Sequence, residues 1–347
     1  MDILILHNGI TAHNFPTIKS LINFNNKISI IDYGKKNKNV CVPKYKNLKI
    51  YKSSNFSFSK IFNLIKKINP KIIVVTGLRS FLCLTVALFF KKKSKIVLAS
   101  DNFIRNSFRQ RIAFFLGFFN FFYLFFDIIW VHGPLQLAYA KKIGFKKDDI
   151  IFDPASADTI FFQGLYKKYL RFKKKIYPKT FLFLGRLEKE KGVDILLKAW
   201  SNLENKIDWK LILVGEGSLK LDYKKLKNVY FLGYKNHKEI QSQIKKSGCF
   251  LLPSIFEPWG VVVHEMSAAG LPLILSDKVG SRFHFLRNSK NGFLFNANNI
   301  KSLENCIIKI TKLNNQELLK MSKISYQLSS KVNADFGAAN LLSIIKS

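Results

Sequence analysis

Acidic side chains are scarce in this 347-residue chain, which has 22 aspartates and glutamates against 57 lysines and arginines and a formal net charge of +35. No glutamate precedes Glu188. Two of the later ones, Glu257 and Glu265, stand on either side of a Pro-Trp-Gly turn and just ahead of a Gly-Leu-Pro turn. Scarce carboxylates in such a setting indicate a chemical task for this segment.

Arginine is also rare, with 8 residues against 49 lysines, and Asn, Ile and Phe are abundant. An AT-rich genome would give this bias at tolerant positions, so composition is one explanation of the charge. A partner with phosphates, anionic lipid or nucleic acid is the other. The charge is spread evenly, +17 over residues 1–163 and +18 over residues 164–347. With no helix-turn-helix, zinc-finger or RNP-like signature, no nucleic-acid partner is expected.

Cysteines are few and far apart, and no C-x-x-C pair occurs, which argues against a zinc site and a disulfide framework. The six histidines show no metal-ligand spacing and no D-x-D pair follows a strand, so no metal is expected. Asp2 stands where a signal peptide would carry positive charge, and only four apolar residues follow it. We therefore expect a cytoplasmic protein. The cysteines are Cys41, Cys83, Cys249 and Cys306.

No hydrophobic run reaches the roughly 20 residues that a membrane-spanning helix needs. Residues 112–126 are the nearest approach, with Asn120 inside the run and Asp127 at its end. Because this run is apolar on every side, it predicts a buried helix or one that touches a membrane. Basic residues flank it, which suits an anionic lipid surface and a peripheral position on the inner face of the cytoplasmic membrane. They are Lys91, Lys92, Lys93, Arg105, Arg109 and Arg111.

Short apolar strand-like runs alternate with helix-like stretches along the whole chain. This alternation predicts α/β architecture with parallel sheets wound by crossover helices. The predicted strands are 3–7, 27–32, 47–51, 71–77, 95–100 and 127–133 in the first half, and 180–187, 210–215, 229–233, 249–254, 272–277 and 292–296 in the second.

A basic stretch without acidic residues, 163–180, separates the two series and is the expected linker. It gives an N-terminal Rossmann-like domain over 1–165 and a C-terminal one over 166–328. Residues 329–347 are expected to form a helix that packs back on the N-terminal domain.

Glycine-rich turns follow the strands of the second half, at Gly185, Gly215, Gly217, Gly233, Gly260 and Gly280. Ligands of open α/β sheets collect at this edge, where loops and helix N-termini converge. The expected site is therefore the cleft between the two domains. The G-x-G at 215–217 lacks a third glycine and is no dinucleotide fingerprint.

Five segments in the second half closely resemble, in order, the C-terminal domain of glycosyltransferase family 4. They are LGRLEKEKGVDILLKAW (184–200), LILVGEGSLK (211–220), VYFLGY (229–234), PSIFEPWGVVVHEMSAAGLPLILSDKVG (253–280) and NGFLF (291–295). Members of this family, the group 1 glycosyl transferases, are retaining enzymes of the GT-B fold, in which two Rossmann-like domains face each other across a cleft. The resemblance implies the same fold and a nucleotide-sugar donor with a UDP, GDP or dTDP group.

The resemblance also implies roles for single residues. Arg186 and Lys191 match the pair that holds the donor diphosphate and would neutralise the leaving group. Glu265 matches the glutamate that accepts both ribose hydroxyls, and Glu257 the one beside the donor sugar. Arg186, Lys191 and Glu257 are the expected catalytic residues. The expected donor-binding set is Arg186, Lys191, Gly215, Tyr234, Glu257, Trp259, Gly260, Val261 and Glu265.

Residues 261–269 should be helical despite three valines, because Gly270 suits a C-terminal cap and Pro272 a stop. For Tyr234 a place near the donor base and simple packing are equally open. For His264 an ordinary place in the helix is at least as well supported as a functional one.

The N-terminal half matches the family less closely. HNGI (7–10) has one glycine where members often have a glycine-rich loop, and Asp101 and Asn102 stand near the place of a family histidine. Ala155-Ser156-Ala157 replaces the usual Asn-Gly-Val, with Asp158 kept. These departures leave the chemistry on the acceptor side open.

The sequence thus predicts a retaining, metal-independent glycosyltransferase that moves a hexose-type sugar to a glycan or lipid-linked acceptor in envelope polysaccharide or lipopolysaccharide-type biosynthesis. A nucleotide-sugar epimerase or hydrolase of the same fold is the nearest alternative. A catalytically degenerate homologue that only binds sugar nucleotides is the other.

Overall fold

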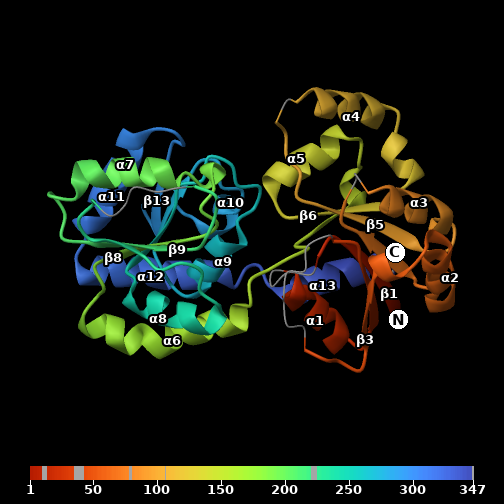
Figure 1. Ribbon diagram of the computed structural model, residues 1–347, viewed down its shortest axis with the longest axis horizontal. Coiled ribbons are helices and arrows are strands. Elements are labelled where there is room, and N and C mark those ends of the chain that lie inside the picture. The colour runs from red at the N-terminus through yellow and green to blue at the C-terminus, as the bar shows by residue number, and fades with distance from the viewer. Residues whose placement is uncertain (10–13, 35–42, 78–79, 106, 220–224, 346–347) are drawn as a thin grey trace. The chain divides into compact units, whose positions relative to one another are not determined.

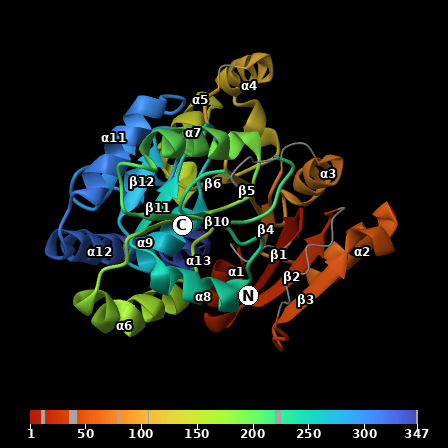
Figure 2. The ribbon, with the colours of Figure 1, turned by 60° about the vertical axis from the view of Figure 1, so that its left-hand side comes forward.

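The computed structural model describes residues 1–9, 14–34, 43–77, 80–105, 107–219 and 225–345. These form two compact units, the first of Met1–Ser156 and Val332–Ser347 and the second of Ala157–Lys331. Each unit is a parallel sheet with helices on both faces (Figures 1 and 2). The predicted architecture of two parallel-sheet α/β domains is confirmed.

The first unit has a seven-stranded sheet among its described residues, in the order β3-β2-β1-β4-β5-β6-β7. Its side chains alternate between two apolar cores, as the two-residue period of a strand requires: Leu4 and Leu6 pack into one, and Ile3 and Ile5 into the other. The strands are β1 (Asp2–His7), β2 (Lys27–Asp32), β3 (Leu48–Lys52), β4 (Ile72–Val75), β5 (Lys95–Ser100), β6 (Ile128–Val131) and β7 (Ile150–Phe152).

Helices cover both cores of this unit. The first core lies under α2 (Phe58–Ile68), α3 (Phe81–Phe90), α4 (Phe108–Phe118) and α5 (Pro134–Lys142), and the second under α1 (Phe15–Asn23) and α13 (Ala334–Ser343). The C-terminal helix α13 therefore packs on the N-terminal unit, beside α1 (Figure 1). The Ser20 hydroxyl, on α1, donates a hydrogen bond of 2.6 Å to the Asp335 carboxylate.

The apolar run 112–126 is not one buried helix, and that alternative of the prediction is wrong. It is divided between α4 and a 3-10 turn at Phe121–Leu124, with Asn120 in the left-handed conformation between them. The inner side of α4 packs closely against the chain after α5: a Cβ on Gly117 would lie only 2.4 Å from the carbonyl carbon of Ile143. The outer side exposes Phe108, Ile112, Phe115 and Phe119, with exposed fractions of 77, 47, 65 and 63%.

The second unit has a six-stranded sheet in the order β10-β9-β8-β11-β12-β13 within its described part. Helices α7 and α11 lie on one face, and α6, α8, α9 and α12 on the other (Figure 1). The strands are β8 (Thr180–Leu184), β9 (Lys210–Val214), β10 (Val229–Phe231), β11 (Cys249–Leu252), β12 (Leu273–Ser276) and β13 (Gly292–Phe295). The helices are α6 (Thr159–Lys175), α7 (Val193–Leu203), α8 (His237–Lys246), α9 (Val261–Ala268), α10 (Arg282–Phe285), α11 (Ile300–Thr311) and α12 (Asn315–Ser329).

Helix α6 occupies most of the stretch predicted as a linker, and the predicted boundary after residue 165 falls inside it. Asp158 caps its start by accepting the N–H of Phe161 at 3.1 Å. Leu165 and even Lys173 are buried, the ammonium group of Lys173 donating to the Ser247 carbonyl at 2.9 Å. The basic composition of this stretch did not indicate a helix. Because α6 packs on the second unit, the boundary between the two units lies near residue 157. None of the helices in the described ranges is long and apolar enough to cross a membrane.

Candidate functional site

The loops that follow five neighbouring strands of the second unit are tied together at the carboxyl edge of the sheet. Backbone hydrogen bonds of 2.9–3.0 Å join the loop after β9 to those after β10 and β8, the loop after β8 to that after β11, and the loop after β11 to that after β12. We call this connected set the rim. The bonds run from Gly215 to Gly233, Leu187 to Glu216, Ile255 to Glu190 and Gly280 to Glu257.

Two glycines make this close approach of loops possible. Gly215 has φ +141°, and a Cβ there would lie 1.8 Å from the carbonyl oxygen of Gly185. Gly260 has φ +85°, and a Cβ there would lie 2.9 Å from Cγ of Glu257. Both positions need glycine, because an L side chain would be strained and would also collide. The turn at Gly260 is fixed from the next loop, where the Ser281 hydroxyl donates to the Gly260 carbonyl at 3.2 Å.

Lys191, on the loop after β8, forms an ion pair with Glu257 on the loop after β11. Both side chains are mostly buried, with exposed fractions of 14% for Lys191 and 10% for Glu257. The rim therefore brings together one cation and one carboxylate that the sequence assigned to the donor diphosphate and to the donor sugar.

Arg186, at the start of the same loop as Lys191, is more open. Its guanidinium pairs with Glu190 four residues later, and 65% of its side chain is exposed. Glu188 between them accepts hydrogen bonds from the N–H and hydroxyl of Ser218 on the loop after β9, at 3.1 and 2.6 Å, and these bonds hold the pKa of its carboxyl below the ordinary range. The loop after β8 is thus held at both ends, and the guanidinium of Arg186 on this loop lies at the surface.

Glu265 lies in α9, whose helical conformation and glycine stop are as predicted: the helix spans Val261–Ala268 and Gly270 has φ +67°. Its carboxyl is buried, and this burial, with the charge of Asp158 as a smaller contribution, raises its pKa to about 7. The group is therefore close to half protonated at neutral pH. A carboxyl in this state can lose its proton when a ligand presents hydroxyl donors.

Three other predicted residues differ in how they could meet a ligand. The ring of Tyr234 is 66% exposed beside the rim, whereas the indole of Trp259 is buried against the ring of His284, at 5.1 Å between centroids. Trp259 can thus offer a ligand only its backbone. Val261 is the first residue of α9, where N–H groups lack partners within the helix.

His264 lies in the interior of the second unit. Its Nδ1 accepts the N–H of Ala157 at 3.2 Å, its Nε2 lies 3.0 Å from the Ser329 carbonyl oxygen, and its ring stacks on Phe285. This is a structural role. Among the described residues, no group of three or more His, Cys, Asp and Glu side chains is arranged to hold a metal ion.

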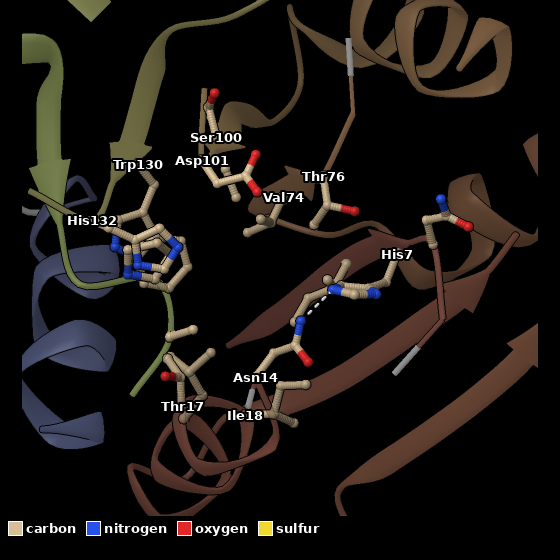
Figure 3. A pocket seen from close by; sticks show the side chains of 16 residues that line it. His7, Asn14, Thr17, Ile18, Val74, Thr76, Ser100, Asp101, Trp130 and His132 are labelled. Carbon is tan, nitrogen blue, oxygen red and sulfur yellow. Dashed lines mark hydrogen bonds between the residues drawn. The ribbon is translucent and has the colours of Figure 1, made fainter. Parts of the chain in front are cut away.

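The first unit has a cavity of about 300 Å³ that the sequence did not predict (Figure 3). Its polar side chains follow β1, β4, β5 and β6, at the carboxyl edge of the sheet. The amide of Asn14 donates to Nε2 of His7 at 2.5 Å, and burial lowers the pKa of His7, which keeps the ring neutral. The clue in the sequence was the polar residue that ends or follows each of these strands: His7, Thr76, Asp101 and His132.

Residues 167–328 match the family model described as glycosyl transferases group 1. The second unit matches this family. The chain is 32% identical over 177 residues to an uncharacterized glycosyltransferase of Haemophilus influenzae, covering 48% of each protein. It is 30% identical over 158 residues to the UDP-Gal:alpha-D-GlcNAc-diphosphoundecaprenol alpha-1,3-galactosyltransferase of Escherichia coli, covering 42% of this chain and 40% of the relative. The chain thus matches less than half the length of these curated relatives.

Solved structures extend the likeness to both units. The chain superimposes on HepE of Anabaena, solved in complex with UDP, with a TM-score of 0.74, 14% identity and full coverage of both chains. Sucrose-phosphate synthase of Thermosynechococcus elongatus gives a TM-score of 0.75 at 14% identity, with 100 and 98% coverage. The fold is GT-B.

Proposed function

We propose that the protein is a glycosyltransferase that moves a hexose-type sugar from a nucleotide-sugar donor to a hydroxyl group of a glycan or lipid-linked acceptor. The observation that carries this proposal is the rim, which holds Arg186, Lys191 and Glu257 on adjoining loops beside the N-terminus of α9. Cations and unpaired N–H groups at such an edge suit a diphosphate. The name of the E. coli relative, which specifies a UDP-linked galactose donor, supports the same donor class.

The chemistry needs no protein nucleophile and no metal ion. The bond between the anomeric carbon and the diphosphate breaks, the acceptor oxygen bonds to that carbon on the same face, and the acceptor proton passes to the departing diphosphate. Configuration is thereby retained. Negative charge builds on the diphosphate as the bond breaks, so the guanidinium of Arg186 and the ammonium of Lys191 would stabilise the transition state more than the ground state.

The two glutamates have different tasks in this proposal. Glu265 accepts the two ribose hydroxyls with its carboxylate oxygens, and Glu257 lies beside the transferred sugar. Glu257 also keeps Lys191 in position through their ion pair, so the sugar contact and the diphosphate contact are coupled.

A screen of UDP-, GDP- and dTDP-sugars tests the proposal, with the shift in melting temperature as the first measurement, because a ligand above its Kd stabilises the folded protein. Turnover of the stabilising donor is then followed with and without candidate acceptors. Turnover that needs no acceptor would favour an epimerase or hydrolase, and binding without any turnover would favour a degenerate homologue. A failure of every sugar nucleotide to bind would refute the donor site.

We also propose that the protein works at the inner face of the cytoplasmic membrane, in the synthesis of an envelope glycan. The support is the outer side of α4, whose exposed residues Phe108, Ile112, Phe115 and Phe119 recur at helical spacing, with the exposed cations Arg109 and Arg111 beside them. An apolar stripe flanked by cations suits an anionic lipid surface, at about 1 kcal/mol for each cation near it.

Flotation with vesicles at low and high salt tests this location. We expect recovery with anionic vesicles to exceed recovery with neutral ones, and the difference to shrink in high salt. Equal recovery with both kinds of vesicle would remove the electrostatic part and leave composition as the explanation of the charge.

A further inference from the structure

A second and larger cavity, of about 1060 Å³, lies in the first unit beyond the ends of β4 and β5. Ser80 and Ser107, the N-cap residues of α3 and α4, both line it, so two helix N-termini meet at one cavity. Arg105 and Arg109 also line it. Four features that favour an anion therefore converge on one space.

The cavity is short of negative charge. Neither α3 nor α4 has an acidic residue in its first turn, and Ser107 makes no side-chain hydrogen bond to cap α4. Asp101 is the one carboxylate among the described residues that line the cavity. Arg109 has no ion-pair partner in the described ranges. The two guanidinium groups and the one carboxylate that line the cavity give it a net positive charge, which favours an anionic ligand.

Helix α4 also carries the exposed apolar stripe described above, which we call its aromatic face. Arg109 and Ala113, one turn apart on α4, line the cavity, and the exposed stripe of Phe108, Ile112, Phe115 and Phe119 runs beside them on the neighbouring side of the helix. One helix thus joins an anion-favouring cavity to an apolar strip. A ligand that uses both parts has a negatively charged head and a long apolar tail.

We propose that this cavity binds the phosphate group of a lipid-linked acceptor, while the aromatic face of α4 lies in the surface of the membrane that holds the tail. Naming this lipid as the acceptor rests on the proposed function. Arg109 is the central contact: a guanidinium donates two parallel hydrogen bonds to a phosphate, and no carboxylate in the described ranges forms an ion pair with it. A free sugar phosphate shares the head-group chemistry and would make no use of the aromatic face.

Vesicles test this inference in the absence of any donor. Phosphatidylcholine vesicles with hexadecyl phosphate are compared with phosphatidylcholine vesicles in which phosphatidylglycerol supplies the same surface charge. We expect at least tenfold tighter binding to hexadecyl phosphate. Arg109→Gln should abolish this preference, and Arg109→Lys, which keeps the charge without the planar fork, should restore part of it. Equal affinity of the unaltered protein for the two kinds of vesicle would overturn the proposal.

Arg111→Gln is the matched control, because Arg111 is exposed on the same helix and does not line the cavity. It should weaken binding to both kinds of vesicle by the same factor, at most about fivefold for one surface cation. Thermal unfolding should show that both variants are folded, as expected for exposed positions. If Arg109→Gln and Arg111→Gln acted alike, the cavity would have no special part in binding and the proposal would be wrong.

Butyl phosphate in solution separates a lipid from a free phosphate. We expect it to compete with the vesicles only at concentrations at least a hundredfold higher, because it lacks the tail. Phe115→Gln should weaken vesicle binding and leave the affinity for butyl phosphate unchanged. If butyl phosphate alone bound as tightly as the vesicles, the ligand would be a soluble phosphate. If the unaltered protein bound the vesicles as expected but bound no sugar nucleotide, the proposed function would be refuted and the lipid-phosphate site would still be supported.

Discussion

Lys191 and Glu257 form an ion pair although 66 positions of the sequence separate them. The pair joins the loop after β8 to the loop after β11, and it occupies the place where a diphosphate is proposed to bind. The ammonium group therefore has one anionic partner in the free protein and would gain a second when the donor arrives. The ion pair also keeps the Lys191 charge in position before the donor binds, which reduces the reorganisation that binding requires.

Removal of one partner of this pair should cost more than removal of both. We expect Lys191→Met to destabilise the protein by about 1–3 kcal/mol, because it leaves the mostly buried carboxylate of Glu257 without its cation. The double variant Lys191→Met/Glu257→Gln should recover a large part of that loss. Urea unfolding of the two single variants and the double variant measures the coupling. Additive effects would show that the pair contributes no interaction energy.

Arg186 and Glu265 should affect different kinetic constants. Arg186→Ala should lower kcat by roughly 10²-fold or more, the scale for loss of an electrostatic contact that strengthens in the transition state. Glu265→Ala should instead weaken donor binding by about 1.5–3 kcal/mol, because the proposed ribose contact is already made in the ground state. Glu257→Ala should change both constants.

Steady-state kinetics with the donor varied, together with calorimetry of the bare nucleoside diphosphate, separates these effects. Tight binding of that diphosphate by Glu265→Ala, equal to that of the unaltered protein, would refute the ribose contact and with it the donor site as proposed.

The carboxyl of Glu265 should give stability and donor affinity opposite dependences on pH. Its pKa rises from an ordinary 4.5 to about 7 on folding, so the folded state holds the proton more tightly than the unfolded chain. The resulting stability is fully present below about pH 4.5 and is lost as the pH rises through 7, a change on the order of 3 kcal/mol. In the proposed donor site the ionised form of Glu265 binds the ribose, so affinity for the donor should rise about tenfold from pH 6 to pH 8.

Glu265→Gln is the control for both measurements, since it cannot titrate. A sugar nucleotide is the correct ligand here, because each of its two phosphates has a single acidic group and keeps the same charge over this range. Denaturant unfolding and calorimetry at pH 5, 6, 7 and 8 give the two curves. If stability and donor affinity changed with pH in the same way in the unaltered protein and in the Gln variant, a group other than Glu265 would be titrating.

The strands of both sheets were predictable because each is a short apolar run with a fixed period. The predicted strand 95–100 matches Lys95–Ser100, and even α9, with its three valines, followed from the glycine that ends it. Buried parallel strands leave little choice of residue, so the pattern survives a biased composition. Strand β7 was not predicted from the sequence.

Contacts that depend on tertiary packing could not be read from the sequence. Nothing in the spacing of Lys191 and Glu257 shows that they pair, since both lie on loops whose conformation depends on neighbouring glycines. The basic composition of 163–180 indicated a linker, yet α6 buries one side of that stretch. In the run 112–126 the error was the reverse: the run is apolar on every side, so the sequence did not show which side is covered.

His264 should act as a clamp on the two segments where the chain passes between the units. The crossings lie between Ser156 and Ala157 and between Lys331 and Val332, and His264 bonds to Ala157 beside the first and to Ser329 beside the second. Since its Nδ1 accepts an N–H, its Nε2 must carry the proton and donate to the Ser329 carbonyl, so the ring is neutral. Replacement by Leu fills the space and removes the bonds of His264 to two buried backbone groups.

We expect His264→Leu to lower the free energy of unfolding by about 2–6 kcal/mol, because each of the two lost bonds should cost about 1–3 kcal/mol. Trypsin should also cleave after Lys331 at least tenfold faster, because cleavage needs local opening of the second crossing. Ser267→Ala is the matched control: it removes the 2.8 Å bond from Ser267 to the Ser325 carbonyl, which joins α9 to α12 away from the crossings. It should cost about 1 kcal/mol and leave cleavage after Lys331 unchanged, since both ends of the clamp stay bonded. Equal acceleration of that cleavage in the two variants would show that His264 only stabilises the second unit as a whole.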